Sequence, residues 1–316
     1  MQQERFIILK TNARCHKIHF KEFLRLLRIS QWYKNLIIPA VGIFSIQIFD
    51  WTIYLFLVIG FLLACGLSSA NYIINDILDI ENDKGHPEKK NRPIASGTIS
   101  IRTAAIIGTI LFIISLGCSF LLSFWFGIVM LTFFLIAQSY TFFLKKIAFV
   151  DIIVISLNFI IRAAGGLTLV IAHLTFELGS ILWPIWAVFI FALFLAVSKR
   201  KADFKLLEAE KALNHKKVYE KYQKQLLEHL VFMVATILLM GYYLYVLLND
   251  QTGGYLLLTV PVATYLMFRY LYLLYSPDKN MGAPEKAIKD PGILIGSITV
   301  LLLFLIIRYL NSFGYI

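Results

Sequence analysis

The chain has 316 residues, of which 59% are hydrophobic, and its mean hydropathy is +0.74. Soluble domains average about 45 to 50% apolar residues even with glycine counted, so this composition excludes an ordinary soluble protein and indicates an integral membrane protein. A net charge of +11 would raise the question of nucleic-acid binding in a soluble protein. Here the membrane surface accounts for it, and we expect no nucleic-acid partner.

The N-terminal segment, residues 1–28, is punctuated by lysines and arginines. It has neither an unbroken apolar core nor a small-residue cleavage pattern, so we do not predict a cleavable signal. A basic amphipathic segment lying on the anionic cytoplasmic leaflet fits the pattern better. We assign residues 29–316 to the transmembrane domain.

Apolar runs of membrane-spanning length recur through that domain. A transmembrane helix needs about 20 mostly apolar residues. Nine candidates follow in chain order: 29–48, 52–74, 100–119, 122–144, 148–172, 178–198, 227–248, 253–275 and 292–313. The sequence therefore predicts an all-α, polytopic bundle of nine transmembrane helices.

The distribution of basic residues predicts the orientation of this bundle. If the spans alternate, 27 of the 30 Lys and Arg residues lie on the side of the N-terminus. The four turns expected on the other side, near 49–52, 120–122, 173–177 and 249–252, contain none. By the positive-inside rule the N-terminus is cytoplasmic, and the protein is a multi-pass component of the cell membrane.

Three carboxylates close the second predicted span. Asp76, Asp79 and Asp83 are spaced i, i+3 and i+7, which places them within an arc of about 60° on one helical face. Carboxylates at a membrane edge are costly unless a cation neutralises them, and hard oxygen ligands suit Mg²⁺. We therefore predict a cytoplasmic magnesium site. The alternative is a helix end capped by solvated acids.

A basic loop follows these acids at once. It contains Lys84, Lys89, Lys90 and Arg92. A metal ion together with lysine and arginine is how proteins commonly clamp a diphosphate, because the cations neutralise its charge. Ser69 and Tyr72 fall on the carboxylate face further into the membrane, and such a half-polar shaft would suit a lipid with a phosphate head.

The fifth predicted span carries a second polar stripe. Asp151, Asn158 and Arg162 are spaced i, i+7 and i+11 and lie within about 40° of one another. Arg162 would lie near mid-membrane, where a lone charge is expensive, so it must face the interior and pair with an acid or a substrate phosphate. A structural ion pair between helices is the alternative. Asp151 lies near the cytoplasmic entrance beside Lys145, and we predict a role in the site for it.

Residues 199–229 are highly charged and predict a cytoplasmic helical hairpin. Most of these charges are expected to form solvated faces. Lys199 and Arg200 are the exceptions, because they leave a transmembrane helix at the level of the acidic motif.

Two motifs carry a resemblance to a known family. Asn75-Asp76-x-x-Asp79-x-x-x-Asp83 at the end of a span, followed by Arg92-Pro93-Ile94-Ala95-Ser96-Gly97, resembles the UbiA superfamily of membrane prenyltransferases over nearly the whole chain. Finer features resemble one branch, the decaprenyl-phosphate phosphoribosyltransferases. They are Arg28-x-x-Gln31-Trp32-x-Lys34-Asn35, His86-Pro87-x-Lys89-x-x-Arg92, Tyr140 with Lys145 and Asp151, Ile161-Arg162-Ala163-x-x-Gly166, Lys199-Arg200-x-Ala202-Asp203 and Gly282-x-Pro284-Glu285.

This resemblance implies a reaction and a set of site residues. Phosphoribose would pass from phosphoribosyl diphosphate to a polyprenyl phosphate, with release of diphosphate, for a cell-surface glycan precursor. The implied catalytic candidates are Asp76, Asp79 and Asp83 with Mg²⁺, together with Lys145 and Asp151. The implied substrate-binding candidates are Lys34, Asn75, Lys89, Arg92, Tyr140, Arg162, Lys199 and Arg200.

Two other functions stay open from the sequence. A prenyl diphosphate donor could alkylate an aromatic or lipid acceptor, although the second acidic motif of such enzymes is reduced here to Asp151 alone. A transporter with a midplane cation site would need charges within the spans away from a catalytic mouth, or repeated broken helices, and we see neither clearly in this chain. The sequence leaves the oligomeric state and the length of the polyprenyl chain open.

Overall fold

The computed structural model describes residues 20–40, 51–85, 89–170, 178–210, 224–248, 254–276 and 284–312. Every regular element in these ranges is a helix, which confirms the all-α prediction. The longer helices are α3 (Trp51–Leu78), α5 (Ile101–Leu122), α6 (Phe124–Phe142), α7 (Val150–Val170), α8 (Leu178–Glu210), α9 (Lys224–Leu248), α10 (Val260–Tyr275, preceded by η8, Tyr255–Thr259) and α12 (Pro291–Ser312).

Seven of the described segments are long and apolar enough to cross a membrane: α3, α5, α6, α7, α9, η8 together with α10, and α12. The chain is therefore a multi-pass membrane protein. The predicted span at 29–48 starts as the 3-10 helix η2 (Ile29–Leu36), and residues 41–48 lie outside the described part. The span at 178–198 lies within α8, where the side chains of 178–182 are not described. The count of nine stays a prediction.

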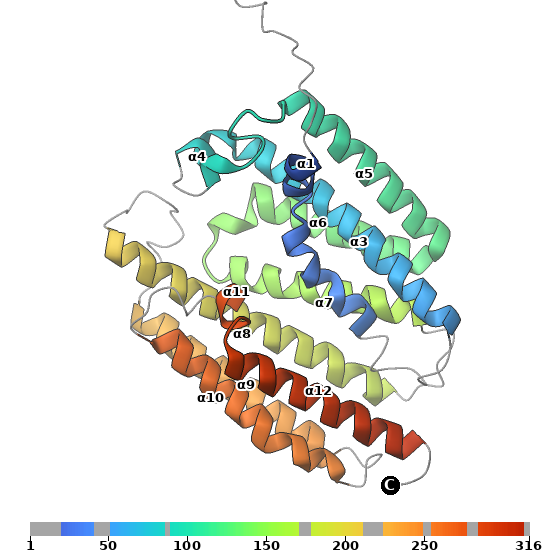
Figure 1. Ribbon diagram of the computed structural model, residues 1–316, viewed down its shortest axis with the longest axis vertical. Helices are drawn as coiled ribbons and strands as arrows, with labels where there is room; N and C mark the ends of the chain where they lie inside the picture. The colour runs from blue at the N-terminus through green and yellow to red at the C-terminus, as the bar shows by residue number, and fades with distance from the viewer. Residues whose placement is uncertain are drawn as a thin grey trace, which may run out of the picture.

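The long helices lie side by side and share one approximate axis (Figure 1). Ser123 alone joins α5 to α6, and the two helices pack against each other, so they run antiparallel. α6 packs on α7, α7 on α8 and α8 on α9, which continues the alternation. As a result, the C-terminal end of α3 and the N-terminal end of α7 lie at the same end of the bundle.

α7 joins two apolar cores. Leu169 and Val170 of α7 belong to a core with α3 and α6, whereas Ile152 packs with α8, α9 and α10. Gly166 allows the helical turn after η2 to approach α7 closely, because a Cβ at this position would lie 2.3 Å from the carbonyl oxygen of Ile38. This contact explains why the chain has glycine there.

Short helices gather at the end of the bundle where α3 finishes. α1 (Phe20–Leu26) and α4 (Ile80–Lys84) lie there, with η3 (Lys89–Asn91) in the basic loop and η4 (Leu144–Lys146) between α6 and α7 (Figure 1). Residues 1–19 of the predicted N-terminal segment and 211–223 of the predicted hairpin lie outside the described residues, so both assignments stay predictions. The hairpin's first part, up to Glu210, continues α8 without a break.

Candidate active site

The acidic motif lies where α3 ends. The helix finishes at Leu78, Asp79 has φ −95° and ψ 12°, and α4 begins at the next residue. Two backbone hydrogen bonds cross this turn, from Asp79 N to Asn75 O (2.9 Å) and from Asp83 N to Asp79 O (2.8 Å). They preserve the i to i+4 register, so the three carboxylates stay near one side of the chain.

Arg92 joins the two outer carboxylates of the motif. Its Nη1 lies 3.0 Å from Asp76 Oδ1 and also donates to Asp83 Oδ2. Asp76 is 4% exposed and Asp83 is 3% exposed. Two nearly buried carboxylates therefore converge on a single positively charged nitrogen, which offsets part of their mutual repulsion.

Arg28 also belongs to this cluster, although it was not among the site residues predicted from the sequence. Its Nη2 donates to Asp76 Oδ1, and its guanidinium carbon lies 5.0 Å from the centre of the Tyr72 ring. The residue has φ 51° and ψ 47° in the turn between α1 and η2, a left-handed conformation that is uncommon outside glycine. No periodicity predicts a contact across 48 residues. The only signal was its place in the Arg28-x-x-Gln31 motif.

The third carboxylate and the remaining cations complete the mouth of the site. Lys145 Nζ, on η4, lies 3.1 Å from Asp79 Oδ1 and 3.2 Å from Oδ2. Lys89 is half-buried within electrostatic reach of Asp79, Asp83 and Arg92. Burial lowers the pKa of Lys89, and the positive charge of Arg92 lowers it further. Three carboxylates thus lie among four cations at the end of an apolar bundle.

Two of the three carboxylates of the mouth are placed where they could bind a magnesium ion. Asp76 and Asp83 already converge on the point held by Arg92 Nη1, and Mg²⁺ commonly binds one or two carboxylates with water and phosphate oxygens completing its shell. Asp79 faces Lys145 instead. Within the described ranges, no three His, Cys, Asp or Glu side chains form a ready-made metal cage. Asp76 and Asp83 are therefore the two carboxylates that could hold a metal ion together with a phosphate ligand.

Asp151, Arg200 and Tyr140 form a second cluster between α6, α7 and α8. Arg200 donates to Asp151 Oδ2 from Nε (2.9 Å) and approaches the same oxygen with Nη2 (2.7 Å). Nη2 also lies 3.5 Å from the Tyr140 hydroxyl. Asp151 is completely buried. This ion pair connects α7 to α8, and removal of either partner would leave an uncompensated buried charge.

Arg162 lies apart from both clusters. It is 6% exposed, and its guanidinium carbon lies 4.6 Å from the Phe133 ring centre and 5.4 Å from that of Phe159. Its Nε has no hydrogen-bond partner, and no carboxylate among the described residues pairs with it. Of the two interpretations given above, the structural ion pair is thus not formed within the described part of the chain.

Three further predicted residues have less defined surroundings. Lys34 is half-buried on η2, with its Nζ 5.8 Å from the Tyr33 ring centre. Lys199 is exposed near Tyr140, and Asn75 is half-buried one residue before Asp76. Their substrate-binding roles stay predictions.

The predicted half-polar shaft is only partly formed by the residues named for it. Ser69 is completely buried, donates to Leu27 O (2.8 Å) and accepts from Trp32 Nε1 (3.1 Å). Its hydroxyl therefore fastens η2 to α3. Tyr72, by contrast, lies beneath Arg28 and is half-buried.

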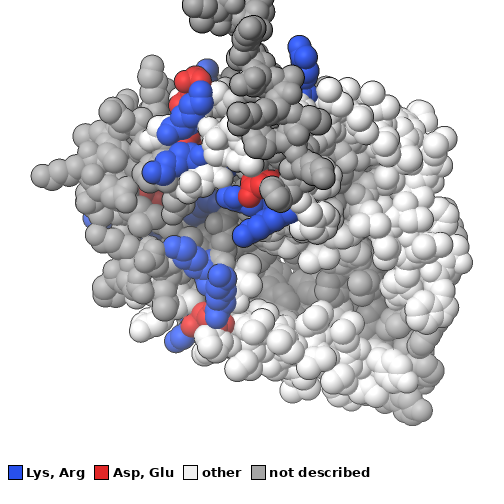
Figure 2. All heavy atoms as spheres, turned by 45° about the horizontal axis from the view of Figure 1, so that its top comes forward, with Lys and Arg blue, Asp and Glu red and all other residues white. Residues whose placement is uncertain are grey.

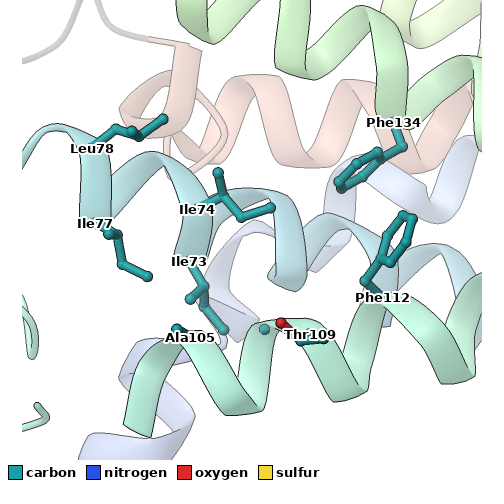
Figure 3. Close-up of a pocket in the computed structure, with 9 residues that line it drawn as sticks. Ile73, Ile74, Ile77, Leu78, Ala105, Thr109, Phe112 and Phe134 are labelled. Atoms are coloured by element: carbon teal, nitrogen blue, oxygen red, sulfur yellow. The ribbon is translucent and has the colours of Figure 1, made fainter. Parts of the chain in front are cut away.

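One face of the molecule divides into a region with charged side chains and a region without them (Figure 2). Lysine, arginine, aspartate and glutamate side chains gather in one band, and a broad neighbouring surface carries none (Figure 2). A separate cavity of about 300 Å³ lies between α3, α5 and α6 (Figure 3). Thr109 is its only polar lining residue, and Ile73, Ile77 and Phe112 contribute apolar walls. None of the described residues that line this cavity carries a charge that would attract a phosphate.

The fold and the site together define a multi-span α-helical membrane protein with an acidic and basic mouth at one end. The model of the UbiA prenyltransferase family matches residues 36–287, and the chain belongs to this family. It is accordingly a membrane transferase.

Two relatives of known name and one solved structure are similar to the chain. The chain is 30% identical over 281 residues to the decaprenyl-phosphate phosphoribosyltransferase of Mycolicibacterium smegmatis. This alignment covers 84% of this chain and 86% of that protein. It is 31% identical over 227 residues to the Corynebacterium glutamicum protein of the same name, covering 70% of this chain and 66% of that one. A solved UbiA homologue from Archaeoglobus fulgidus, bound to GPP and Mg²⁺, has a TM-score of 0.68 at 18% identity, covering 91% of this chain and 99% of that chain. This last likeness supports the fold.

Proposed function

We propose that the protein transfers 5-phosphoribose from phosphoribosyl diphosphate to a polyprenyl phosphate, with release of diphosphate. The reaction would take place at a mouth on the cytoplasmic face of the cell membrane, and the ribosyl lipid would serve cell-surface glycan synthesis. The observation that carries the proposal is the convergence of Asp76 and Asp83 on Arg92, with Lys145 and Lys89 beside them. The names of the relatives support the choice of donor and acceptor.

The cations of the mouth would bind the leaving diphosphate. Arg92, Lys89 and Lys145 lie within one cluster with the carboxylates, so their charge would offset the negative charge that develops as the bond from C1 to the diphosphate oxygen breaks. An oxygen of the lipid phosphate would form the new bond to C1 from the opposite side, with inversion. This phosphate is already an anion, so no general base is needed.

Asp76 and Asp83, with Asp79 as the third candidate ligand, would hold Mg²⁺. When bound, the metal would supply positive charge that neutralises part of the negative charge of the diphosphate. In the structure Arg28, Arg92 and Lys145 compensate these carboxylates. Substrate binding would therefore require these cations to turn from carboxylate to phosphate oxygens, a short movement within the same cluster.

The remaining polar groups would position the two substrates. Lys34, Lys199 and Arg162 are the candidates for holding the lipid phosphate and the ribose 5-phosphate. The Asp151 and Arg200 pair would keep Tyr140 and the start of α7 in place beside Lys145, because it links three helices at the level of the mouth.

A prenyl diphosphate donor with an aromatic or lipid acceptor is the second candidate function. The Archaeoglobus neighbour, which binds GPP, favours it, since the mouth would accept a diphosphate on either donor. The fully buried Asp151 is already paired with Arg200, which weakens the case for a second metal site there.

The two functions differ in which labelled donor yields a labelled lipid. Purified protein with Mg²⁺ should convert phosphoribosyl diphosphate labelled at C1 and a polyprenyl phosphate into a labelled lipid and diphosphate. Incorporation from a prenyl diphosphate, with none from phosphoribosyl diphosphate, would replace the proposal with the second function.

A further inference from the structure

Arg162 on α7 is a buried cation that the mouth does not use. Only 6% of its surface is exposed, and Phe133 and Phe159 cover its guanidinium. Its Nε has no hydrogen-bond partner, and no carboxylate from the described residues neutralises it. A charge buried in this way is costly, and within a membrane span it marks a functional group by default.

A second unsatisfied group lies one helical turn away. Asn158 donates from Nδ2 to the carbonyl of Val154 (3.0 Å), but its buried Oδ1 has no partner among the described residues. Asn158 and Arg162 are spaced i and i+4, so their side chains are neighbours on one face of α7. A donor and an acceptor thus lie together without a protein partner, and both would be satisfied by a ligand with anionic oxygens and a hydroxyl.

The other side chains near Arg162 do not supply the missing charge. Tyr72 and Cys65, both on α3, lie close enough to act on it electrostatically, and neither is a carboxylate. Tyr72 lies one turn, or about 6 Å, before Asp76 along α3. Tyr72 therefore lies near both the mouth, through Arg28, and Arg162.

We propose that Arg162 and Asn158 form a subsite for a phosphate monoester. The planar guanidinium matches phosphate oxygens, and a monoester in its singly charged form, or an adjoining ribose, offers a hydroxyl to Asn158 Oδ1. This inference rests on the proposed function, in which both substrates carry a phosphate monoester: the ribose 5-phosphate of the donor and the head group of the lipid acceptor. The diphosphate belongs to the mouth, so Arg162 binds one of these two groups.

Two substitutions test the subsite in different ways. Asn158→Asp places a carboxylate one turn from Arg162, which gives the guanidinium an internal partner and repels phosphate. Arg162→Met replaces the cation with an apolar side chain of similar length. Because burial of an unpaired charge is costly, loss of the guanidinium removes a destabilising group, and Arg162→Met should not lower the melting temperature.

Arg269→Met is the matched control. Arg269 also lies in a membrane-spanning helix, but it donates to both carboxylate oxygens of Asp290, at 3.0 and 2.8 Å. Its loss leaves Asp290 without this partner. The control should therefore lower the melting temperature and leave ligand binding unchanged.

Binding is measured by calorimetry or by thermal shift with three probes: ribose 5-phosphate, farnesyl phosphate, and inorganic diphosphate with Mg²⁺. Wild-type protein should bind the monoesters, and both α7 variants should lose about tenfold or more in affinity for one of them. The monoester that is lost identifies the substrate held by Arg162. Binding of diphosphate should be the same in all variants.

Unchanged affinity of both α7 variants for both monoesters would overturn the subsite, as would a wild-type protein that binds neither. The result is separable from the test of the proposed function. If phosphoribosyl transfer is absent but the variants still lose monoester binding, the subsite stands and the function falls. If transfer is present and monoester binding is unaffected, only the subsite falls.

Discussion

Replacement of Arg92 by glutamine should destabilise the protein because two carboxylates depend on one guanidinium. Removal of one partner from a buried ion pair costs about 3 to 5 kcal/mol. Two observations reduce this figure here: the Arg92 side chain is 26% exposed, and Asp76 keeps Arg28 as a second cation. We therefore expect a loss of about 2 to 3 kcal/mol, or roughly 5 °C in melting temperature for a chain of this size.

A double-mutant cycle separates this ion pair from other effects of the substitution. Asp83→Asn alone should also destabilise the protein, and in combination with Arg92→Gln it should cost about 1 to 3 kcal/mol less than the sum of the single variants. Glu81→Gln is the control. Its partner Lys84 lies 2.8 Å away, but both side chains are largely exposed, so the change should be below about 1 kcal/mol.

The assay is thermal unfolding of purified protein in detergent, run beside the transfer reaction. Each single variant should lose about 10² to 10³-fold in kcat/KM, because cations that stabilise a leaving group contribute that much. The double variant should lose less stability than the sum of the single losses, without any recovery of activity. Additive losses of stability in the cycle would refute the shared ion pair, and full activity in Arg92→Gln would refute its role toward the diphosphate.

Three further predictions follow from neighbouring contacts. Lys145→Gln should lower kcat/KM by about 10²-fold while the melting temperature changes little, because its pair with Asp79 is partly exposed; a large fall in stability with normal turnover would contradict this. Burial and Arg92 lower the pKa of Lys89, so kcat/KM should begin to fall at a pH below the usual lysine range as the pH is raised. Lys89→Arg should move this alkaline fall to higher pH. An unchanged pH profile would show that Lys89 is not the group responsible for it. The hydrogen bonds from Arg269 hold the pKa of Asp290 below its usual value, so this pair stabilises the fold above about pH 4 and is lost as the pH falls through the lowered pKa. Asp290→Asn should remove that acid dependence from the melting curve, and an unchanged acid midpoint would show that the pair contributes nothing.

The positions of the spans could be predicted from hydropathy because each buries a long apolar run. The predicted span 100–119 corresponds to α5, Ile101–Leu122, and 227–248 falls within α9, Lys224–Leu248. The second span was predicted to end at residue 74, but α3 continues to Leu78. Asp76 is retained in the helix because Arg28 and Arg92 compensate its charge, which a count of apolar residues does not register.

The contacts of the candidate site were predictable only where they are local. Helical spacing placed Asp76 and Asp83 near each other, and the loop that follows supplied Arg92. The approach of Arg28 depends on a left-handed turn and on the docking of η2 against α3 through Trp32, so it depends on tertiary structure.

The stripe on α7 shows the same limit. The spacing correctly put Asp151 and Arg162 on one helix at different depths. It gave no information on which residues of other helices meet them. Arg200, from α8, pairs with Asp151, and the rings of Phe133 and Phe159 cover Arg162. These contacts are determined by the packing of helices that lie far apart in sequence.

The most direct measurement is the rate at which label from C1 of phosphoribosyl diphosphate enters polyprenyl phosphate, compared between wild-type protein and Asp76→Asn. Asp76 is the carboxylate that both Arg28 and Arg92 hold, so it lies at the centre of the mouth. The account predicts Mg²⁺-dependent formation of labelled lipid by the wild-type protein and a fall of about 10²-fold or more in a folded Asp76→Asn variant. Equal rates in the two proteins, or no labelled lipid from the wild type, would contradict it.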